Sequence, residues 1–257
     1  RHAASLNFVL YTMGGAIFIL IGIIVVYRLT PTQSFAMAAI AQAAAALPRE
    51  EQVWLLLAFL VGFGVKIPLF PLHGWLPLAH VEAPSPVSIL LSGVLLKMGA
   101  YGLLRVAPML PEATLALQPL LAGIALVSIL YGGLLAWRQS DLKAMIAYSS
   151  VSHMGVVVLG ISALNETGLL GASLQMVAHG LIAGALFLLI GLLYERTHTR
   201  QVADYGALAR VTPGFTLFVT LALLAGMGIP GLFGFVAELH VLIGGFGRRI
   251  ETAGGLA

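Results

Sequence analysis

The chain has 257 residues, of which 60% are apolar or aromatic and 9% are charged, against roughly 25% charged residues in an average soluble domain. Thirteen lysines and arginines against ten aspartates and glutamates leave a formal charge of +3 and no basic patch that could follow nucleic-acid phosphates. These values exclude a soluble enzyme, a disordered chain and a nucleic-acid-binding protein. The lack of cysteine also excludes disulfide scaffolds, thiolate metal sites and iron–sulfur ligation.

A membrane-spanning helix needs about 20 mostly apolar residues. Seven stretches meet that length, the second and the last with interruptions: 7–27, 53–79, 86–107, 114–137, 143–162, 168–194 and 214–246. A membrane β-barrel would instead alternate polar and apolar residues in segments of about ten. We therefore predict an all-α, multi-pass protein in a lipid bilayer. The chain starts at Arg1 without a Met and ends in a Gly-rich tail, so we expect an internal piece of a longer protein.

The connections between these spans are short, except for residues 28–52. The Ala-rich middle of that loop, at 36–46, predicts a small helix on the surface. Lysine and arginine are enriched in cytoplasmic loops, and they are slightly more frequent on the side of the N-terminus, which we expect to be cytoplasmic. That side carries Arg1, Arg138, Lys143, Arg196, Arg200 and Arg210, and the other carries Arg28, Arg49, Arg105, Arg248 and Arg249.

Two of the spans carry helix breakers near mid-depth. Pro68 and Pro71 interrupt the first, because each removes a backbone donor and clashes with the preceding turn. In the second, four glycines and Pro230 lie within residues 226–234. Irregular backbone at membrane depth survives only where protein or water covers it, and paired interruptions are typical of transporters built from structural repeats. The alternative is two ordinary proline kinks.

Five ionisable side chains lie inside the predicted spans: Lys66, Lys97, His153, His179 and Glu238. A charge at the bilayer centre costs about 2.5–3.5 kcal/mol on insertion scales, so such groups face a protein interior or a wet cavity and usually mark an ion path. Burial disfavours the charged forms of lysine and glutamate, and histidine titrates near neutral pH. We therefore predict a row of groups that passes protons with water between them. The alternatives are packing roles for the histidines and snorkelling of Lys66 to the surface.

The other polar and aromatic residues in or near the spans are given structural roles. His240 is either a second member of the Glu238 site or a residue nearer the surface. His73, His80 and Glu82 are expected to form a polar plug, and Glu195, Arg196, His198 and Arg200 a solvated helix end. Trp75, Trp137 and Tyr194 suit anchoring at the membrane interface. No metal or cofactor site is predicted. A haem held by His153 and His179 is conceivable, but the surrounding charges argue against it.

Several motifs surround these residues. They are KIPLFPLHGWLP from Lys66, LLKMGAYGLLR up to Arg105, DLKAMIAYSSVSHMG from Asp141, MVAHG from Met176, LYERTHTR up to Arg200 and GIPGLFGFVAE up to Glu238. Together they resemble the antiporter-like membrane subunits of complex I, the NADH-quinone oxidoreductase. Within that family the sequence looks most like the subunit M type, which is called chain 4 in mitochondria and the D-type subunit in cyanobacteria and plastids.

The resemblance implies a fold of fourteen helices in inverted repeats, each repeat with one broken helix. All of residues 1–257 would be transmembrane, with 1–107 the end of the first repeat and 114–257 most of the second. Lys66 matches the broken-helix lysine and Lys97 the central lysine. His153 and His179 match the relay histidines, and Glu238 the glutamate near the second broken helix. By the same resemblance, the full fold has two features that this sequence does not include. One is the glutamate that pairs with the Lys66-type residue, on the preceding helix, and the other is the last two helices.

By this resemblance the chain is a proton-translocating subunit with no redox centre and no cofactor of its own. NADH, quinone and iron–sulfur clusters belong to partner subunits, with ferredoxin as an alternative electron donor and Na⁺ as an alternative ion. The expected location is a bacterial inner membrane, or a thylakoid or other energy-coupling membrane. Two other interpretations stay open: a subunit of a multisubunit cation/proton antiporter or energy-converting hydrogenase, and a structural membrane scaffold.

Overall fold

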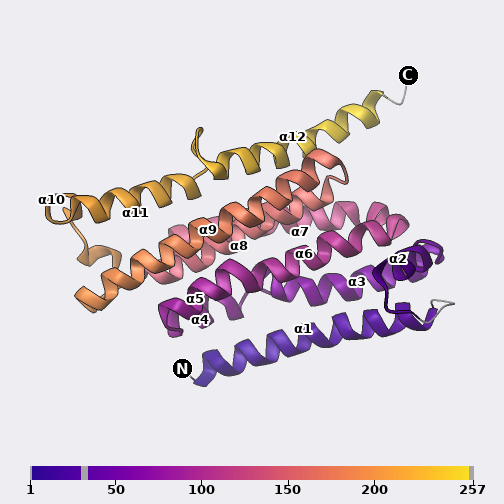
Figure 1. Cartoon of the computed structure of the whole chain (residues 1–257), viewed down its shortest axis with the longest axis horizontal. Helices are drawn as coiled ribbons and strands as arrows, with labels where there is room; N and C mark the ends of the chain where they lie inside the picture. Colours follow the sequence, from indigo (N-terminus) through magenta and orange to yellow (C-terminus); the bar gives the residue numbers. More distant parts are fainter. Residues whose placement is uncertain (1, 30–33, 255–257) are drawn as a thin grey trace.

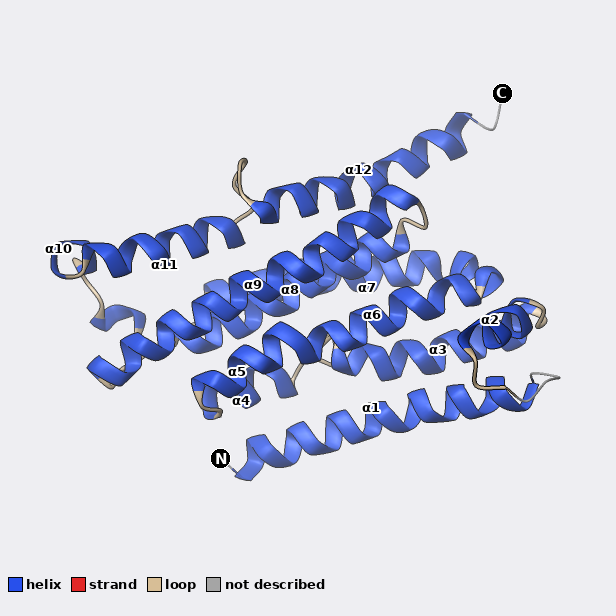
Figure 2. Ribbon diagram, in the orientation of Figure 1, coloured by secondary structure: helices blue, strands red, loops and turns tan. Residues whose placement is uncertain are grey.

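The computed structural model describes residues 2–29 and 34–254, with side chains up to Gly247. Within these ranges the chain forms helices joined by turns, without a strand (Figure 2). The long helices run side by side, with the first at one edge of the bundle and the last two at the opposite edge (Figure 1). Arg1, which entered the topology argument, lies outside the described residues, and so do the side chains of Arg248 and Arg249.

Twelve α-helices make up the described part of the chain. They are α1 (His2–Leu29), α2 (Met37–Ala45), α3 (Arg49–Lys66), α4 (Trp75–Glu82), α5 (Ser85–Leu90), α6 (Leu96–Val106), α7 (Pro111–Trp137), α8 (Leu142–Ser162), α9 (Glu166–Thr197), α10 (Leu208–Val211), α11 (Pro213–Gly226) and α12 (Phe233–Gly254). A π-helical segment, Leu91–Leu95, joins α5 to α6. The small surface helix expected at 36–46 is α2.

Five of the described helical segments are long and apolar enough to cross a membrane by length and composition: His2–Leu29, Ser85–Met109, Pro111–Trp137, Leu142–Ser162 and Glu166–Thr197. They agree with five of the seven predicted spans. The two interrupted spans are the pairs α3–α4 and α11–α12, whose halves are separate helices. The all-α, multi-pass fold is therefore confirmed, while the number of crossings stays a prediction.

Helix α8 lies in the middle of the bundle, between α7 and α9, and it also contacts α4 and α12. Its side chains Ala147, Val151, Met154 and Val158 are buried. By contrast, α1 at the edge carries large apolar side chains that are largely exposed, such as Leu10 and Met13. Lipid tails are as apolar as a protein core, so an exposed apolar face is normal for a membrane helix. Three polar residues of α8, Lys143, Ser150 and Ser162, are buried as well.

The first break separates α3 from α4 and leaves backbone groups without helical partners. The indole Nε1 of Trp75 donates to the carbonyl of Val65 at 2.8 Å, and the amide of Phe70 donates to Ser128 Oγ on α7 at 3.0 Å. Trp75 is fully buried, so its predicted role as an interface anchor is wrong. The reason is that the broken backbone needs a donor at depth, where no water supplies one.

The second break, between α11 and α12, is made by glycine. Gly228 has φ +67° and Gly231 has φ +95°, both in the left-handed region that residues with a Cβ rarely adopt. The helix resumes at Phe233. Both interruptions thus lie where the sequence predicts them. After each one the chain continues in about the same direction, so the second helix of each broken span runs alongside the neighbouring helices.

We expect Trp75→Phe to weaken the first break, because it keeps the ring but leaves the buried Val65 carbonyl without a donor. An unsatisfied buried acceptor costs about 1–3 kcal/mol. The measurement is the amount of assembled complex that survives graded heating, read on native gels. Trp137→Phe is the matched control, since Trp137 is 82% exposed. Equal losses for the two variants would contradict the role of the Trp75 hydrogen bond.

Candidate functional site

The site starts at a local irregularity of the helix that carries Lys97. In the π-helical segment, the amide of Leu96 donates to the carbonyl of Leu91, five residues earlier. The carbonyl of Ser92, which an α-helix would pair with that amide, accepts a hydrogen bond from Lys97 Nζ at 2.5 Å instead. Single π turns are often found at functional sites. Here the π turn supplies an oxygen ligand for a lysine ammonium inside the membrane, a feature that hydropathy could not reveal.

Lys97 Nζ also lies 2.5 Å from Nδ1 of His179 on α9, a hydrogen bond that joins residues 82 positions apart. On the other side of the ring, His179 Nε2 lies 3.0 Å from Ser150 Oγ on α8, and Ser150 Oγ donates to the carbonyl of Ile146. Lys97 and His179 therefore compete for one proton, since two cations at this distance would repel each other strongly in a low-dielectric interior.

The row continues from His179 to the second broken helix. The rings of His153 and His179 are 5.4 Å apart, centroid to centroid. Gln175 Nε2 lies 3.2 Å from His153 Nδ1, and Glu238 Oε1 lies 3.6 Å from the same nitrogen. Neutral His153 can accept from the Gln175 amide, and protonated His153 can donate toward the Glu238 carboxylate. Nδ1 of His153 thus faces one partner suited to each of its protonation states.

A cavity of about 170 Å³ lies beside the two histidines, between α8, α9 and the end of α11. It is lined by His153, His179, Ser149, Gly226 and apolar side chains. A water molecule needs polar partners and a volume of about 30 Å³, so the cavity has room for several waters next to both rings.

Lys66 lies apart from this row. It ends α3, and a Cβ added at Gly99 of α6 would come 2.7 Å from the Lys66 Cβ, so only glycine lets α6 approach this closely. The Lys66 side chain is half-buried. Among the described residues, it has no hydrogen bond or ion pair. Four of the five predicted residues therefore form a row in space, in the order Lys97, His179, His153 and Glu238. Lys66 lies outside the row, on a helix that neighbours the one with Lys97.

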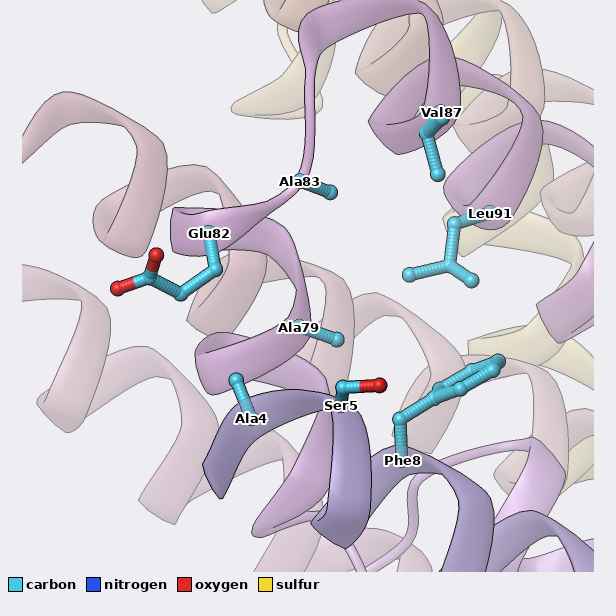
Figure 3. A pocket seen from close by; sticks show the side chains of 8 residues that line it. All are labelled: Ala4, Ser5, Phe8, Ala79, Glu82, Ala83, Val87 and Leu91. Carbon is cyan, nitrogen blue, oxygen red and sulfur yellow. The ribbon is translucent and has the colours of Figure 1, made fainter. Parts of the chain in front are cut away.

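Several other sequence predictions on polar side chains are wrong. The expected polar plug does not form: His73 packs against the rings of Phe70 and Tyr131, whereas His80 stacks on Phe187 of α9. Glu82 is exposed and borders a hollow of about 270 Å³ between α1, α4 and α5. Its carboxylate points away from the apolar side chains that fill the other side of that hollow (Figure 3), so this hollow offers no acid–base chemistry.

For His240 the structure favours the alternative outside the Glu238 site, and for Arg200 the prediction is wrong. His240 Nδ1 contacts the carbonyl of Val236, four residues back on its own helix, and within the described part of the chain it forms no hydrogen bond or ion pair with Glu238. Arg200 does not belong to a solvated helix end: it forms an ion pair with Asp141 at 3.1 Å and donates to the carbonyl of Val81 at 2.8 Å.

Lys143 is a second cation with an unexpected partner. It is buried and donates to the carbonyl of Ala83. From the sequence alone, Lys143 is only a basic residue on the side of the N-terminus, and Arg200 is expected in solvent. Nothing local in the sequence signals partners that lie 60 to 119 residues away.

The geometry also bears on cofactors. Among the residues that the structure describes, no group of three or more His, Cys, Asp or Glu could hold a metal ion. Both ring nitrogens of His179 are engaged, by Lys97 and Ser150, which leaves neither nitrogen for a haem iron. The arrangement suits proton exchange between titratable groups better than ligation.

Comparison with known proteins places this geometry in a family. Residues 1–253 match the family model for the transmembrane region of NADH:quinone oxidoreductase and Mrp antiporter subunits. The chain belongs to this family. It is 48% identical over 246 residues to NAD(P)H-quinone oxidoreductase chain 4 1 of Synechococcus sp. (strain JA-2-3B'a(2-13)), covering 95% of this chain and 46% of that protein. It therefore spans about half the length of this family member.

Solved structures of family members share the fold. Respiratory complex I from Thermus thermophilus matches with a TM-score of 0.90 and 37% identity, over 96% of this chain and 52% of the matched one. The Mrp complex from Dietzia sp. DQ12-45-1b matches with a TM-score of 0.82 and 25% identity, over 98% of this chain and 46% of the other. The chain therefore has the antiporter-like fold and is a multi-pass membrane protein. Its resemblance to the chain 4 type is confirmed.

At the second break, the Glu238 carboxylate packs against Gly228. A Cβ at Gly228 would run into the Glu238 carboxylate, and the positive φ adds about 1–2 kcal/mol of strain. We therefore expect Gly228→Ala to displace Glu238 and to lower proton translocation by the assembled complex in membrane vesicles.

Two alanine variants separate the clash from the strain. Gly231→Ala introduces the strain alone, because nothing lies within 4 Å of its Cβ position, and Gly245→Ala introduces neither. We expect the rate of proton translocation to be highest in Gly245→Ala, lower in Gly231→Ala and lowest in Gly228→Ala. If Gly231→Ala and Gly228→Ala lose the same amount, contact with Glu238 is not what requires glycine at position 228.

Proposed function

We propose that this chain translocates protons as part of an antiporter-like membrane subunit of a complex I-type NADH (or ferredoxin)-quinone oxidoreductase. The observation that carries the proposal is the row from Lys97 through His179 and His153 to Glu238, built from four helices, with His179 buried and the other three partly buried. Ionisable groups in a membrane interior are costly and usually functional, and here each one lies next to another that can take its proton.

The proposed transfer runs along atoms that already face each other. Lys97 ammonium releases a proton to His179 Nδ1, across the 2.5 Å contact. His179 passes a proton to His153 through water in the adjacent cavity, because their rings do not form a hydrogen bond. Protonated His153 then turns its Nδ1–H from Gln175 toward Glu238. Each step moves a positive charge one helix further, and its departure allows Lys97 to be protonated again.

Lys66 is proposed to set the charge state of Lys97 rather than to exchange protons with it directly. The close approach at Gly99 brings the two lysine-bearing helices together. Two ammonium groups on neighbouring helices repel each other, and the repulsion is strong in a low-dielectric medium. Protonation of Lys66 therefore favours proton release from Lys97 toward His179.

Electron transfer is proposed to take place in partner subunits, which would bind NADH, quinone and iron–sulfur clusters. This chain would move H⁺ alongside other membrane subunits. The proposed location is an energy-coupling membrane, with a bacterial inner membrane as the first choice. The two broken spans, α3–α4 and α11–α12, support the division into repeats at 1–107 and 114–257. The Mrp-type antiporter is the second candidate, because the Dietzia complex shares the fold; its lower identity, 25% against 37%, favours the complex I type.

We expect Lys97→Ala to abolish most proton translocation in the full-length chain within its assembled complex, because the row loses the group that loads His179. Quinone reduction and uptake of a pH-sensitive dye would be followed in the same vesicles. Removing one general acid–base group typically lowers proton-transfer rates about 10²–10⁴-fold. Arg196→Ala is the control, since Arg196 is exposed at the end of α9. Unchanged pumping by Lys97→Ala would favour a structural scaffold.

His153→Gln tests the transfer toward Glu238. Glutamine keeps a polar side chain that can bond to Gln175 but cannot carry a proton at neutral pH, so we expect proton translocation to fall at least tenfold with normal assembly. His240→Gln is matched in chemistry, and among the described residues the side chain of His240 forms a hydrogen bond only within its own helix. We expect that variant to pump at the wild-type level. Equal effects of the two changes would remove His153 from the path.

A further inference from the structure

A cluster of charges outside the proton row joins three distant segments of the chain. Asp141 precedes α8, Arg200 follows α9, and Val81 to Ala83 lie at the end of α4. Arg200 Nε contacts Asp141 Oδ2 at 3.1 Å, and Arg200 Nη1 donates to the carbonyl of Val81 at 2.8 Å. The backbone adds to the junction, because the amide of Leu142 donates to the carbonyl of Arg200 at 2.9 Å.

The carbonyls at the end of α4 are the common target of this cluster. The carbonyl of His80 accepts from Ser88 Oγ at 3.4 Å, that of Val81 accepts from Arg200, and that of Ala83 accepts from Lys143 Nζ. The last carbonyls of a helix lack intrahelical partners and carry partial negative charge, so cations stabilise this end. Two cations from α8 and from the segment after α9 thus hold the end of a helix that neither belongs to.

This support matters because α4 is short and follows the first break. It has eight residues, and an irregular stretch separates it from α3, so no continuous helix fixes its axial position. His80 on α4 is fully buried, stacks on Phe187 at 4.5 Å, and among the described residues has no hydrogen-bond partner for either ring nitrogen. A shift of α4 would therefore move a titratable ring that packs on α9, the helix that carries His179.

We infer that Asp141 and Arg200 form a latch that positions α4, and with it His80, against α9, the helix that carries His179 of the proton row. Neither residue exchanges protons in this scheme; both are positioning residues. The latch depends on the shapes of its two members. Asp141 uses Oδ1 to cap α8, accepting from the amides of Lys143 and Ala144 at 2.8 and 3.0 Å, and Oδ2 to bind Arg200. Arg200 uses two nitrogens of its planar fork for two partners, which a lysine ammonium at the end of a flexible stem does not reproduce.

Arg200→Lys and Asp141→Asn therefore break the latch with little other damage. The first keeps the positive charge, and the second keeps an oxygen that can cap α8. Arg196→Lys is the matched control, because Arg196 lies one turn earlier, is exposed, and forms no hydrogen bond or ion pair with the other described residues. All variants are made in the full-length chain and studied in its assembled complex.

The first measurement is amide hydrogen exchange of peptides covering residues 75–83, followed by mass spectrometry. It reports local opening of α4 whether or not the chain pumps protons. We expect exchange there to be about fivefold faster or more in Arg200→Lys and in Asp141→Asn, with no change in peptides from the middle of α9 and none in Arg196→Lys. Unchanged exchange in α4 for both latch variants overturns the proposal.

The second measurement is the number of protons translocated per quinone reduced, since the role of α4 in proton transfer rests on the proposed function. We expect this ratio to fall at least about twofold in both latch variants, because misplaced groups transfer protons less efficiently. Faster exchange in α4 with an unchanged ratio overturns the positioning role and leaves a stabilising contact. If Lys97→Ala also leaves the ratio unchanged, the proposed function fails, while the exchange result still decides whether the latch holds α4.

Discussion

Hydrocarbon offers no hydrogen-bond partner, and this single constraint explains most of the unusual features of the molecule. Each interruption of a helix frees backbone groups that the protein must satisfy internally. Trp75 satisfies the carbonyl of Val65 at the first break, and Lys97 satisfies the carbonyl of Ser92 at the π-helical segment. In the second case the freed carbonyl is also a ligand for a lysine ammonium. This one hydrogen bond therefore both satisfies the backbone and holds an ionisable group at depth.

The proposed proton row follows from how the bundle is assembled around α8. Lys97 comes from α6, His179 from α9, His153 from α8 and Glu238 from α12, so no single helix contains two consecutive members. A proton moving along the row must cross from helix to helix, and small changes in helix packing therefore alter the contacts it depends on. The cavity beside the histidines lies at one of these crossings.

The two breaks divide their spans into short helices, and the structure shows two ways of holding them. Gly228 allows the backbone after α11 to lie against the Glu238 carboxylate. At the other break, side chains of Trp75, Lys143 and Arg200 bind backbone carbonyls before and after the interruption. In the first case the absence of a side chain creates the contact. In the second, long polar side chains bridge segments that the break has separated.

The sequence by itself determined the fold class, the places of the two breaks and the five ionisable residues at depth, because apolar length, proline, glycine and isolated charges are local signals. It could not determine that Lys97 meets His179 rather than Lys66, that Trp75 is buried, or that Arg200 binds Asp141 and the end of α4. Those contacts depend on the rotation and register of neighbouring helices. In a membrane protein both the lipid-facing and the core-facing sides of a helix are apolar, so no amphipathic pattern records which side turns inward. Only the tertiary structure decided that.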